Sequence, residues 1–234
     1  MAAAEGGCEG GTHLTSIEEP DMIVTIVGAG NMARGIGTRA LAGGHSVRLH
    51  DRTRAKAEEL ATALSQAAPE ADVTAVGPDA VGDSDIVVLA LPHPAGHEVA
   101  AAWADALAGK TVVDISNPVD FTTFDSLTVP PGTSAAEQIA AAVPESRVVK
   151  AFNTTFAGPL TEGQVAGRPL DVFIAGDDDT AKQTVSALVS SAGLRPLDVG
   201  PLRRARELEA FQFLHMASQE RLGLNWSSAI AILP

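Results

Sequence analysis

Two glycines and an alanine in this sequence have the spacing of residues that admit a dinucleotide pyrophosphate. Gly28, Gly30 and Ala33 form a G-x-G-x-x-A pattern directly after the apolar run 22–27. In such a turn the first glycine permits the tight bend, the second lets the backbone approach the pyrophosphate, and the small third residue lets the helix pack on the strand. The helix then offers N-terminal N–H groups and a partial positive charge to the phosphates. The pattern predicts a cofactor-binding turn made of Gly28, Ala29, Gly30, Asn31, Met32 and Ala33.

A second group of candidate residues follows the next apolar segment, 46–50. Asp51 lies 23 residues after Gly28, where the ribose-recognising end of the second strand belongs. The adjacent Arg52 and Thr53 suit the 2′-phosphate of NADP, whereas a carboxylate at Asp51 suits the free ribose of NAD. We therefore expect NADP, with NAD as the alternative, and assign Asp51, Arg52 and Thr53 to the cofactor site.

The elements that position these residues alternate between apolar strand patterns and helical patterns. This alternation predicts an α/β fold: a Rossmann-type doubly wound parallel sheet with a small C-terminal α/β extension. Strands are expected at 22–27, 46–50, 73–76, 85–91, 111–115, 147–152, 170–175 and 194–199. Helices are expected after the glycine turn to residue 41 and at 54–67, 96–108, 134–142, 179–192 and 201–222.

In such a sheet, ligands bind at the carboxyl ends of the strands. The loops there contribute the remaining candidates. His93, with neighbouring His97, has no evident third metal ligand, and three consecutive aspartates at 177–179 suit a helix N-terminus better than a metal, so no metal site is predicted. No Ser/His/Asp arrangement or P-loop stands out. The expected cofactor-binding residues in these loops are Leu91, Pro92, His93, Asn117, Pro118, Asn153, Thr154 and Thr155.

Composition excludes several classes of protein. The net charge of −13 argues against nucleic acid or an anionic membrane as partner. The single cysteine, Cys8, excludes a disulfide framework and a cysteine-ligated metal. No apolar run approaches the roughly 18 residues of a membrane span, and residues 1–20 lack the pattern of a signal peptide. We expect residues 1–20 to be a flexible tail and the protein to be cytoplasmic.

With these segments assembled, the chain resembles the NADPH-dependent reductases of the 8-hydroxy-5-deazaflavin coenzyme F-420, a fold shared with the cytosolic domain of membrane ferric reductases. The resemblance covers nearly the whole chain from Met22. It rests on the stretches GAGNMARG at 28–35, VVKAFNT at 148–154, AGDDD at 175–179 and GLRPLDVGPL at 193–202.

The resemblance implies an NADP-dependent oxidoreductase that transfers a hydride reversibly between NADP(H) and the deazaflavin coenzyme F-420. The deazaflavin would lie over the nicotinamide, with Asn153 and Thr155 as the catalytic residues. Two positions depart from the pattern. The reductases usually have a small polar residue where Asp51 stands, and the archaeal reductases have a histidine where Asn153 stands, whereas the ferric-reductase branch has an asparagine.

Two other functions stay open on the sequence alone. One is an NAD(P)H-dependent reductase of a flavin, ferric chelate or small carbonyl or imine substrate, and the other is a non-catalytic dinucleotide-sensing module. Residues 21–152 are expected to form the Rossmann dinucleotide-binding domain. Residues 153–234 are expected to complete the deazaflavin site, and their apolar C-terminal segment predicts a homodimer.

Overall fold

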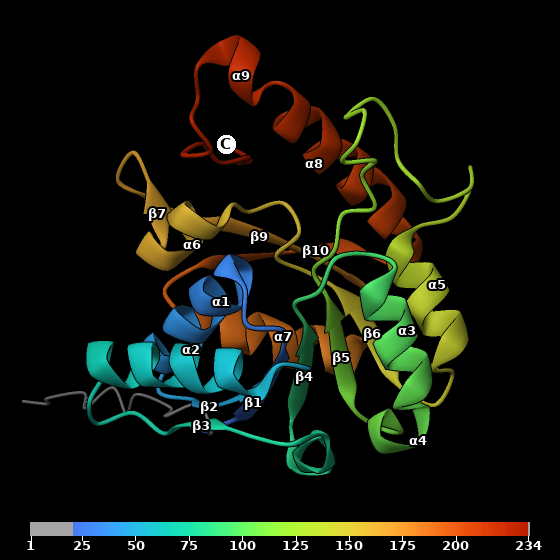
Figure 1. Ribbon diagram of the computed structural model, residues 1–234. Helices are drawn as coiled ribbons and strands as arrows, with labels where there is room; N and C mark the ends of the chain where they lie inside the picture. The colour runs from blue at the N-terminus through green and yellow to red at the C-terminus, as the bar shows by residue number, and fades with distance from the viewer. Residues whose placement is uncertain (1–20, 234) are drawn as a thin grey trace, which may run out of the picture.

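The protein folds around one eight-stranded sheet. A computed structural model describes residues 21–233 (Figure 1), so the predicted tail at 1–20 and Cys8 lie outside the described residues. The strand order is β10-β9-β6-β5-β4-β1-β2-β3. The strands are β1 (Ile23–Val27), β2 (Ser46–His50), β3 (Val73–Ala75), β4 (Ile86–Leu89), β5 (Thr111–Asp114), β6 (Arg147–Lys150), β9 (Asp171–Gly176) and β10 (Arg195–Gly200). A separate two-stranded hairpin is formed by β7 (Gln164–Val165) and β8 (Arg168–Pro169).

Helices connect these strands and cover both faces of the sheet. One face carries α1 (Asn31–Ala42), α2 (Arg54–Ala67) and α7 (Asp179–Ser191), and the other carries α3 (Ala95–Ala102), α4 (Ala104–Leu107) and α5 (Ala135–Ala142). The remaining helices are α6 (Ala157–Glu162), α8 (Ala205–Ala217) and α9 (Gln219–Leu222), with short 3₁₀ turns η1 (Pro78–Asp83) and η2 (Leu202–Arg204).

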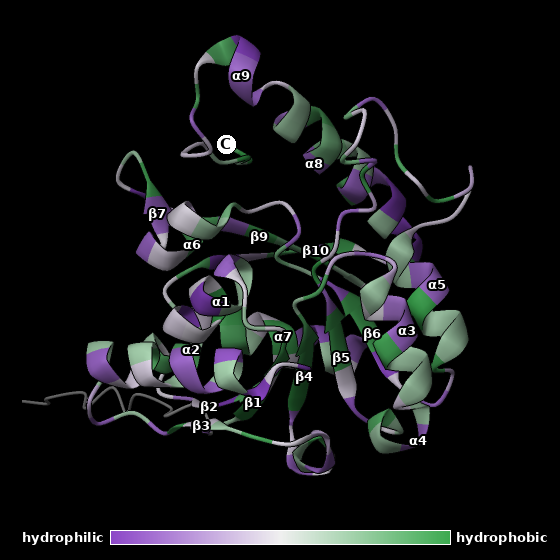
Figure 2. Cartoon of the chain, in the orientation of Figure 1, coloured by the Kyte–Doolittle hydropathy of each residue, from purple (hydrophilic) through white to green (hydrophobic). Residues whose placement is uncertain are grey.

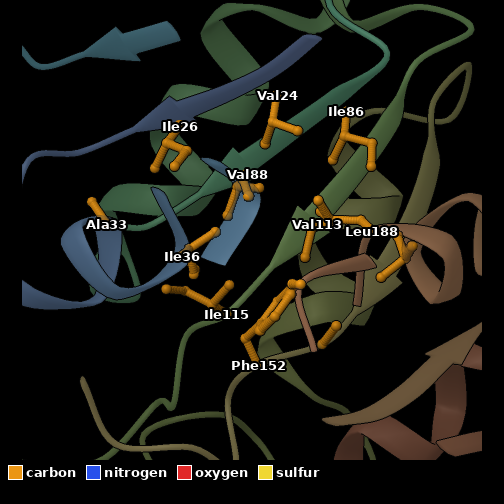
Figure 3. Close-up of a cluster of buried hydrophobic side chains, with 14 of the residues drawn as sticks. Val24, Ile26, Ala33, Ile36, Ile86, Val88, Val113, Ile115, Phe152 and Leu188 are labelled. Carbon is orange, nitrogen blue, oxygen red and sulfur yellow. The ribbon is translucent and has the colours of Figure 1, made fainter. Parts of the chain in front are cut away.

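Alternation along the strands divides the core into two layers. Successive side chains of a strand point to opposite faces, so Ile86 and Val88 pack with α1 while Val87 and Leu89 pack with α3 and α5. Figure 3 shows the first layer, in which Ile36 of α1 lies among side chains of the central strands. Hydrophobic residues concentrate on the central strands in Figure 2. Most side chains in the core are aliphatic and many are β-branched, in line with the low aromatic content of 4%.

The order β3-β2-β1-β4-β5-β6 is that of a doubly wound nucleotide-binding sheet, and the predicted Rossmann-type fold is confirmed. The direction in which successive strands are added to the sheet reverses between β1 and β4, which are parallel neighbours. The loops that leave these two strands therefore border the crevice in which such sheets bind ligands.

The sheet differs from a fully parallel one at a single pairing among the described strands. β9 pairs antiparallel with β6, because the chain turns back through α6 and the β7–β8 hairpin before it enters the sheet. β10 then follows β9 in parallel through α7. β9 and β10 extend the same sheet, so the sheet continues beyond residue 152. The predicted division into domains at 21–152 and 153–234 stays a prediction.

Two predicted helices are interrupted. The helix expected at 96–108 breaks at Trp103, whose backbone (φ −108°, ψ 17°) ends α3 and precedes α4. The helix expected at 201–222 comprises η2, α8 and α9, with a break at Ser218, where the hydroxyl donates to the His215 carbonyl at 2.9 Å. A hydroxyl that binds a carbonyl of the preceding turn competes with the helical pattern. No helix within residues 21–233 is long and apolar enough to cross a membrane.

Candidate active site

The glycine turn between β1 and α1 has the geometry that its spacing predicts. Gly28 has a φ of +113°, and a Cβ there would lie 2.4 Å from the Ala90 carbonyl oxygen, so only glycine fits. A Cβ on Gly30 would meet no atom within 4 Å, so the space beside its backbone is open. Ala33 is fully buried and packs α1 onto the sheet. The turn thus combines a tight bend at Gly28, open space beside the backbone of Gly30, and a helix packed closely on the sheet at Ala33. These three features together fit a pyrophosphate.

The N-terminus of α1 is electrostatically suited to an anion. No side chain caps it, and no acidic residue lies in its first turn. Its N–H groups carry a partial positive charge of the macrodipole, which favours a phosphate at this end.

Asp51 is engaged by the protein backbone. Its Oδ2 accepts a hydrogen bond from Ala29 N at 3.2 Å, and its Oδ1 accepts one from Thr53 N at 2.8 Å. The carboxylate therefore fastens the glycine turn to the loop that follows β2. Both oxygens face backbone donors, a pair of contacts that sequence reasoning did not foresee. Each carboxylate oxygen can accept a second hydrogen bond, so the assignment of Asp51 to the cofactor site stays a prediction.

The basic residues after Asp51 differ in their availability. Arg54 is paired with Glu58, with 2.7 Å between Nε and Oε1. Arg52 is exposed and forms no ion pair within the described part of the chain. Arg52 is thus the guanidinium of this loop that is open to a 2′-phosphate.

The loops after β5 and β6 are held together by two asparagines. Asn117 Nδ2 donates to the Asn153 carbonyl at 2.9 Å, and Asn153 Nδ2 donates to Asn117 Oδ1 at 3.0 Å. Asn153 Nδ2 also approaches the Leu208 carbonyl of α8 at 3.3 Å. The structure therefore brings together two residues that the sequence places 36 positions apart.

Four buried polar atoms in the loops at this sheet edge have no hydrogen-bond partner within the described residues. Buried polar groups are nearly always paired, so each exception indicates a missing partner or a functional role. Their gathering in the consecutive loops after β4, β5 and β6 marks a place where a polar ligand can bind. These atoms are His93 Nδ1, Ser116 Oγ, Asn153 Oδ1 and Thr154 Oγ1.

Thr155, predicted as catalytic, has a hydroxyl that donates to the Phe152 carbonyl at 2.7 Å. Its proton is therefore used within the loop. Phe152 itself has a φ of 61°, a left-handed conformation that is strained for a bulky residue. Strain of this kind is maintained at functional loops by the surrounding structure, and no sequence pattern indicated it.

An ion cluster below these loops was also missed by sequence reasoning. Lys150 Nζ lies 2.7 Å from Asp114 Oδ2, 2.7 Å from Glu209 Oε1 and 2.5 Å from the Ser116 carbonyl. The three charged side chains are at most 1% exposed. The sequence contains one indication of this cluster, because Asp114 and Lys150 are charged residues that each end an apolar strand. In the sheet these two residues are partners in register.

Burial shifts the pKa of one histidine at this edge of the sheet. Burial lowers the pKa of His93, while the Asp114 carboxylate opposes this effect. No group of three potential metal-ligating side chains occurs among residues 21–233.

The C-terminal segment reaches the site through aromatic contacts. The ring of Phe156 lies 4.6 Å from the ring of His215 in α8 and 5.1 Å from Trp226, measured between centroids. Beside these residues a pocket is lined by Phe124, Met216, Ala217, Gln219, Glu220, Gly223, Asn225 and Trp226. Trp226 lines this pocket, which sequence reasoning did not identify, and also contacts Phe156 in the loop after β6.

Comparisons with known proteins find relatives of this chain. A family described as "NADP oxidoreductase coenzyme F420-dependent" matches residues 23–118. The chain is 31% identical over 199 residues to the F420-dependent NADP reductase of Methanocaldococcus jannaschii, a match that covers 80% of this chain and 87% of that one.

Two further similarities point to the same fold. The chain is 34% identical over 187 residues to the metalloreductase STEAP3 of Rattus norvegicus; the match covers 80% of this chain but spans only 36% of that longer protein. A crystal structure of a putative F420-dependent NADP reductase from an Arthrobacter species has a TM-score of 0.77 and 30% identity, and covers 91% of this chain and 100% of that one.

Proposed function

We propose that this chain transfers a hydride reversibly between NADP(H) and the deazaflavin coenzyme F-420, because it belongs to the coenzyme F420-dependent NADP oxidoreductase family. The chain is an NADP-dependent oxidoreductase by that membership, and the deazaflavin is the part that we add. The observation that carries the proposal is the set of unpaired, buried polar atoms that lines the loops next to the glycine turn.

The pyrophosphate binds at the glycine turn in this proposal. Gly28 and Gly30 admit it, and the uncapped N-terminus of α1 stabilises its charge. Arg52 and Thr53 hold the 2′-phosphate, since Arg54 is paired with Glu58 and the Asp51 carboxylate accepts from the backbone.

The reacting rings stack at the loops after β5 and β6. When bound, the nicotinamide supplies a hydride from its C4 atom. Asn153 Oδ1 and Thr154 Oγ1 offer the unpaired polar atoms that orient a ring, and Asn117 fixes Asn153. Hydride transfer between two bound rings depends chiefly on alignment at about 3–3.5 Å. The hydride passes to the deazaflavin ring, and the proton that completes its reduction comes from solvent. The pocket beside Trp226 and Phe124 gives room for a second, flat ring system.

Absorbance spectroscopy tests the acceptor directly. Purified protein is mixed with oxidised deazaflavin and NADPH, then with NADH, and loss of the deazaflavin band is followed. Rapid loss of the deazaflavin band is expected with NADPH and not with NADH. Arg52→Ala is expected to raise the KM for NADPH by about 10- to 100-fold, as loss of a charged hydrogen-bond partner does, and to leave the KM for NADH unchanged.

Arg54→Ala is the matched control, because Arg54 also carries a guanidinium in this loop but is paired with Glu58. Equal losses in both variants would contradict the assignment of the 2′-phosphate to Arg52. No bleaching with either cofactor, despite tight dinucleotide binding, would exclude the deazaflavin as acceptor.

A ferric chelate is the second candidate acceptor. The observation that favours it is the 34% identity to the metalloreductase, together with the asparagine at 153 that the ferric-reductase branch shares. Reduction of a ferric chelate by NADPH without deazaflavin would support this candidate. A protein that binds NADP(H) but reduces no acceptor would be a dinucleotide sensor.

We also propose that the protein forms a homodimer through its C-terminal segment. Six of the seven exposed large hydrophobic side chains among the described residues lie in this segment: Phe211, Leu214, Leu222, Trp226, Ile232 and Leu233. An apolar surface of this kind favours a protein interface. Light scattering is expected to give the mass of a dimer, and Leu214→Glu, a charge on the most exposed of these side chains (67% exposed), is expected to give a monomer.

A further inference from the structure

The buried cluster of Lys150, Asp114 and Glu209 has one more negative charge than positive. One ammonium group faces two carboxylates. The two remaining carboxylate oxygens accept from backbone donors: Asp114 Oδ1 from Ser116 N at 2.9 Å and Glu209 Oε2 from Ala135 N at 3.1 Å. Burial raises the pKa of Glu209 and Lys150 opposes this effect. Because each oxygen of Glu209 faces an N–H donor, a proton there would have no acceptor, so the geometry favours the ionised carboxylate.

Nearby groups offset this charge only in part. Ala135 is the first residue of α5, and a helix N-terminus contributes about half a positive charge. Burial lowers the pKa of His93, so its imidazole is neutral at neutral pH. Arg206, on the same helix as Glu209, is paired with Glu137 at 2.6 Å. A net negative charge therefore remains in the protein interior.

This charge lies directly beneath the loops that receive the reacting ring. Lys150 donates to the Ser116 carbonyl, and the hydroxyl of the same Ser116 is one of the unpaired buried atoms of the site. Asn153 follows Lys150 by three residues and contacts the carbonyl of Leu208, the neighbour of Glu209. Two strand ends and α8 thus hold the cluster against the site.

The nicotinamide ring is neutral in NADPH and carries one positive charge in NADP⁺. When the C4–H bond breaks, both of its electrons leave with the hydrogen to the acceptor, and the ring becomes cationic. We propose that the buried negative charge of Asp114, Glu209 and Lys150 stabilises the oxidised, cationic nicotinamide relative to the reduced one. Charge fixed in advance where charge develops is an effective way to lower a reaction barrier. The cluster would thereby favour hydride donation from NADPH.

Binding measurements test this inference without any acceptor. The dissociation constants for NADP⁺ and NADPH are measured by titration for the wild-type protein and for Glu209→Gln. The neutral amide keeps the shape of the side chain and removes one charge. The ratio of the constant for NADP⁺ to that for NADPH is expected to rise about five- to tenfold, the scale of one charge in a partly screened interior.

Three variants serve as controls. Asp114→Asn removes a charge from the same cluster, and the same rise is expected. Glu209→Asp keeps the charge, and a ratio near that of the wild type is expected. Glu137→Gln removes a carboxylate from α5 that is partly exposed and paired with Arg206, and the ratio is expected to change by less than about twofold because solvent screens that charge.

Circular dichroism first establishes that each variant is folded. Equal weakening of NADP⁺ and NADPH in Glu209→Gln and Asp114→Asn, or no change with either, would overturn the inference. If neither variant folds, the wild-type protein decides: it must bind NADP⁺ at least as tightly as NADPH, and a clear preference for NADPH would refute the proposal. The inference rests on the NADP site and not on the deazaflavin, so the absence of deazaflavin reduction would leave it standing.

Discussion

Asn117 and Asn153 hydrogen-bond each other across the ends of two neighbouring strands. Each side-chain amide donates to the other residue, at 2.9 and 3.0 Å. Asn153 is 1% exposed, and its Oδ1 has no partner within the described residues. The pair therefore fixes the loop after β6 and leaves one acceptor available to a ligand.

Replacing Asn153 by alanine is expected to affect the chemical step more than dinucleotide binding. The pyrophosphate is held at the glycine turn, so the dissociation constant for NADPH should change by less than about threefold. Loss of ring alignment should lower the single-turnover rate of hydride transfer about 10- to 100-fold. Stopped-flow absorbance and equilibrium titration measure the two quantities. Gln183→Ala, which removes an exposed amide from α7, should change neither, and an equal loss of both in Asn153→Ala would contradict the assignment.

Asp51→Ala is expected to weaken NADPH and NADH alike. The carboxylate connects Ala29 N to Thr53 N, so its removal loosens the turn that both cofactors use. Loss of hydrogen bonds to a charged group predicts about 10-fold weaker binding of each. Fluorescence titration with the two cofactors measures the effect. A variant that loses NADH but binds NADPH more tightly would instead show that Asp51 contacts the ribose.

The C-terminal segment is fastened by Asp171. Arg195 donates to both of its oxygens, and Ile232 N donates to Oδ2 at 2.8 Å. Burial alone would raise the pKa of Asp171, but these hydrogen bonds outweigh burial and hold the pKa below its ordinary value of 3.8. Because the folded pKa is the lower one, the stabilisation is complete above the unfolded pKa and is lost as the pH falls through the folded pKa.

Asp171→Asn is accordingly expected to lower Tm at neutral pH by several degrees. The difference from the wild type should shrink as the pH falls below about 3.8, the ordinary value. Thermal melts across the pH range measure this, with Asp79→Asn, an exposed aspartate of η1, as the control. A difference that stays constant down to pH 2 would show that the carboxylate's charge is not the cause.

The parts of the site that the sequence predicted depend on local patterns. The bend at Gly28, the open space at Gly30 and the buried position of Ala33 follow from residues within one turn. The doubly wound sheet follows from the alternation of strand and helix patterns along the chain. The direction of β9 could not be predicted, because it is set by the connection through α6 and the hairpin and not by its own residues.

The parts that the sequence did not predict depend on distant pairs. Lys150 lies 36 residues from Asp114 and 59 residues from Glu209 in the sequence, so no local pattern indicates that the three side chains meet. The hydroxyl of Thr155 could turn toward a ligand or into its own loop, and only the fold decides that it donates to Phe152. Packing, and not residue type, determines these assignments.

Replacement of the two glycines of the turn is expected to have different effects on thermal stability. Gly30 has an ordinary backbone conformation (φ −85°), and a Cβ there would occupy open space. Gly30→Ala should therefore keep the wild-type Tm while the added methyl group blocks the approach of the pyrophosphate, with about 10- to 100-fold weaker NADPH binding. Gly28→Ala places a Cβ 2.4 Å from the Ala90 carbonyl oxygen at a φ of +113°, so it should lower Tm as well as binding. Calorimetry of unfolding and of binding separates the two effects. If Gly30→Ala bound NADPH as the wild type does, the open space at residue 30 would not be where the pyrophosphate lies.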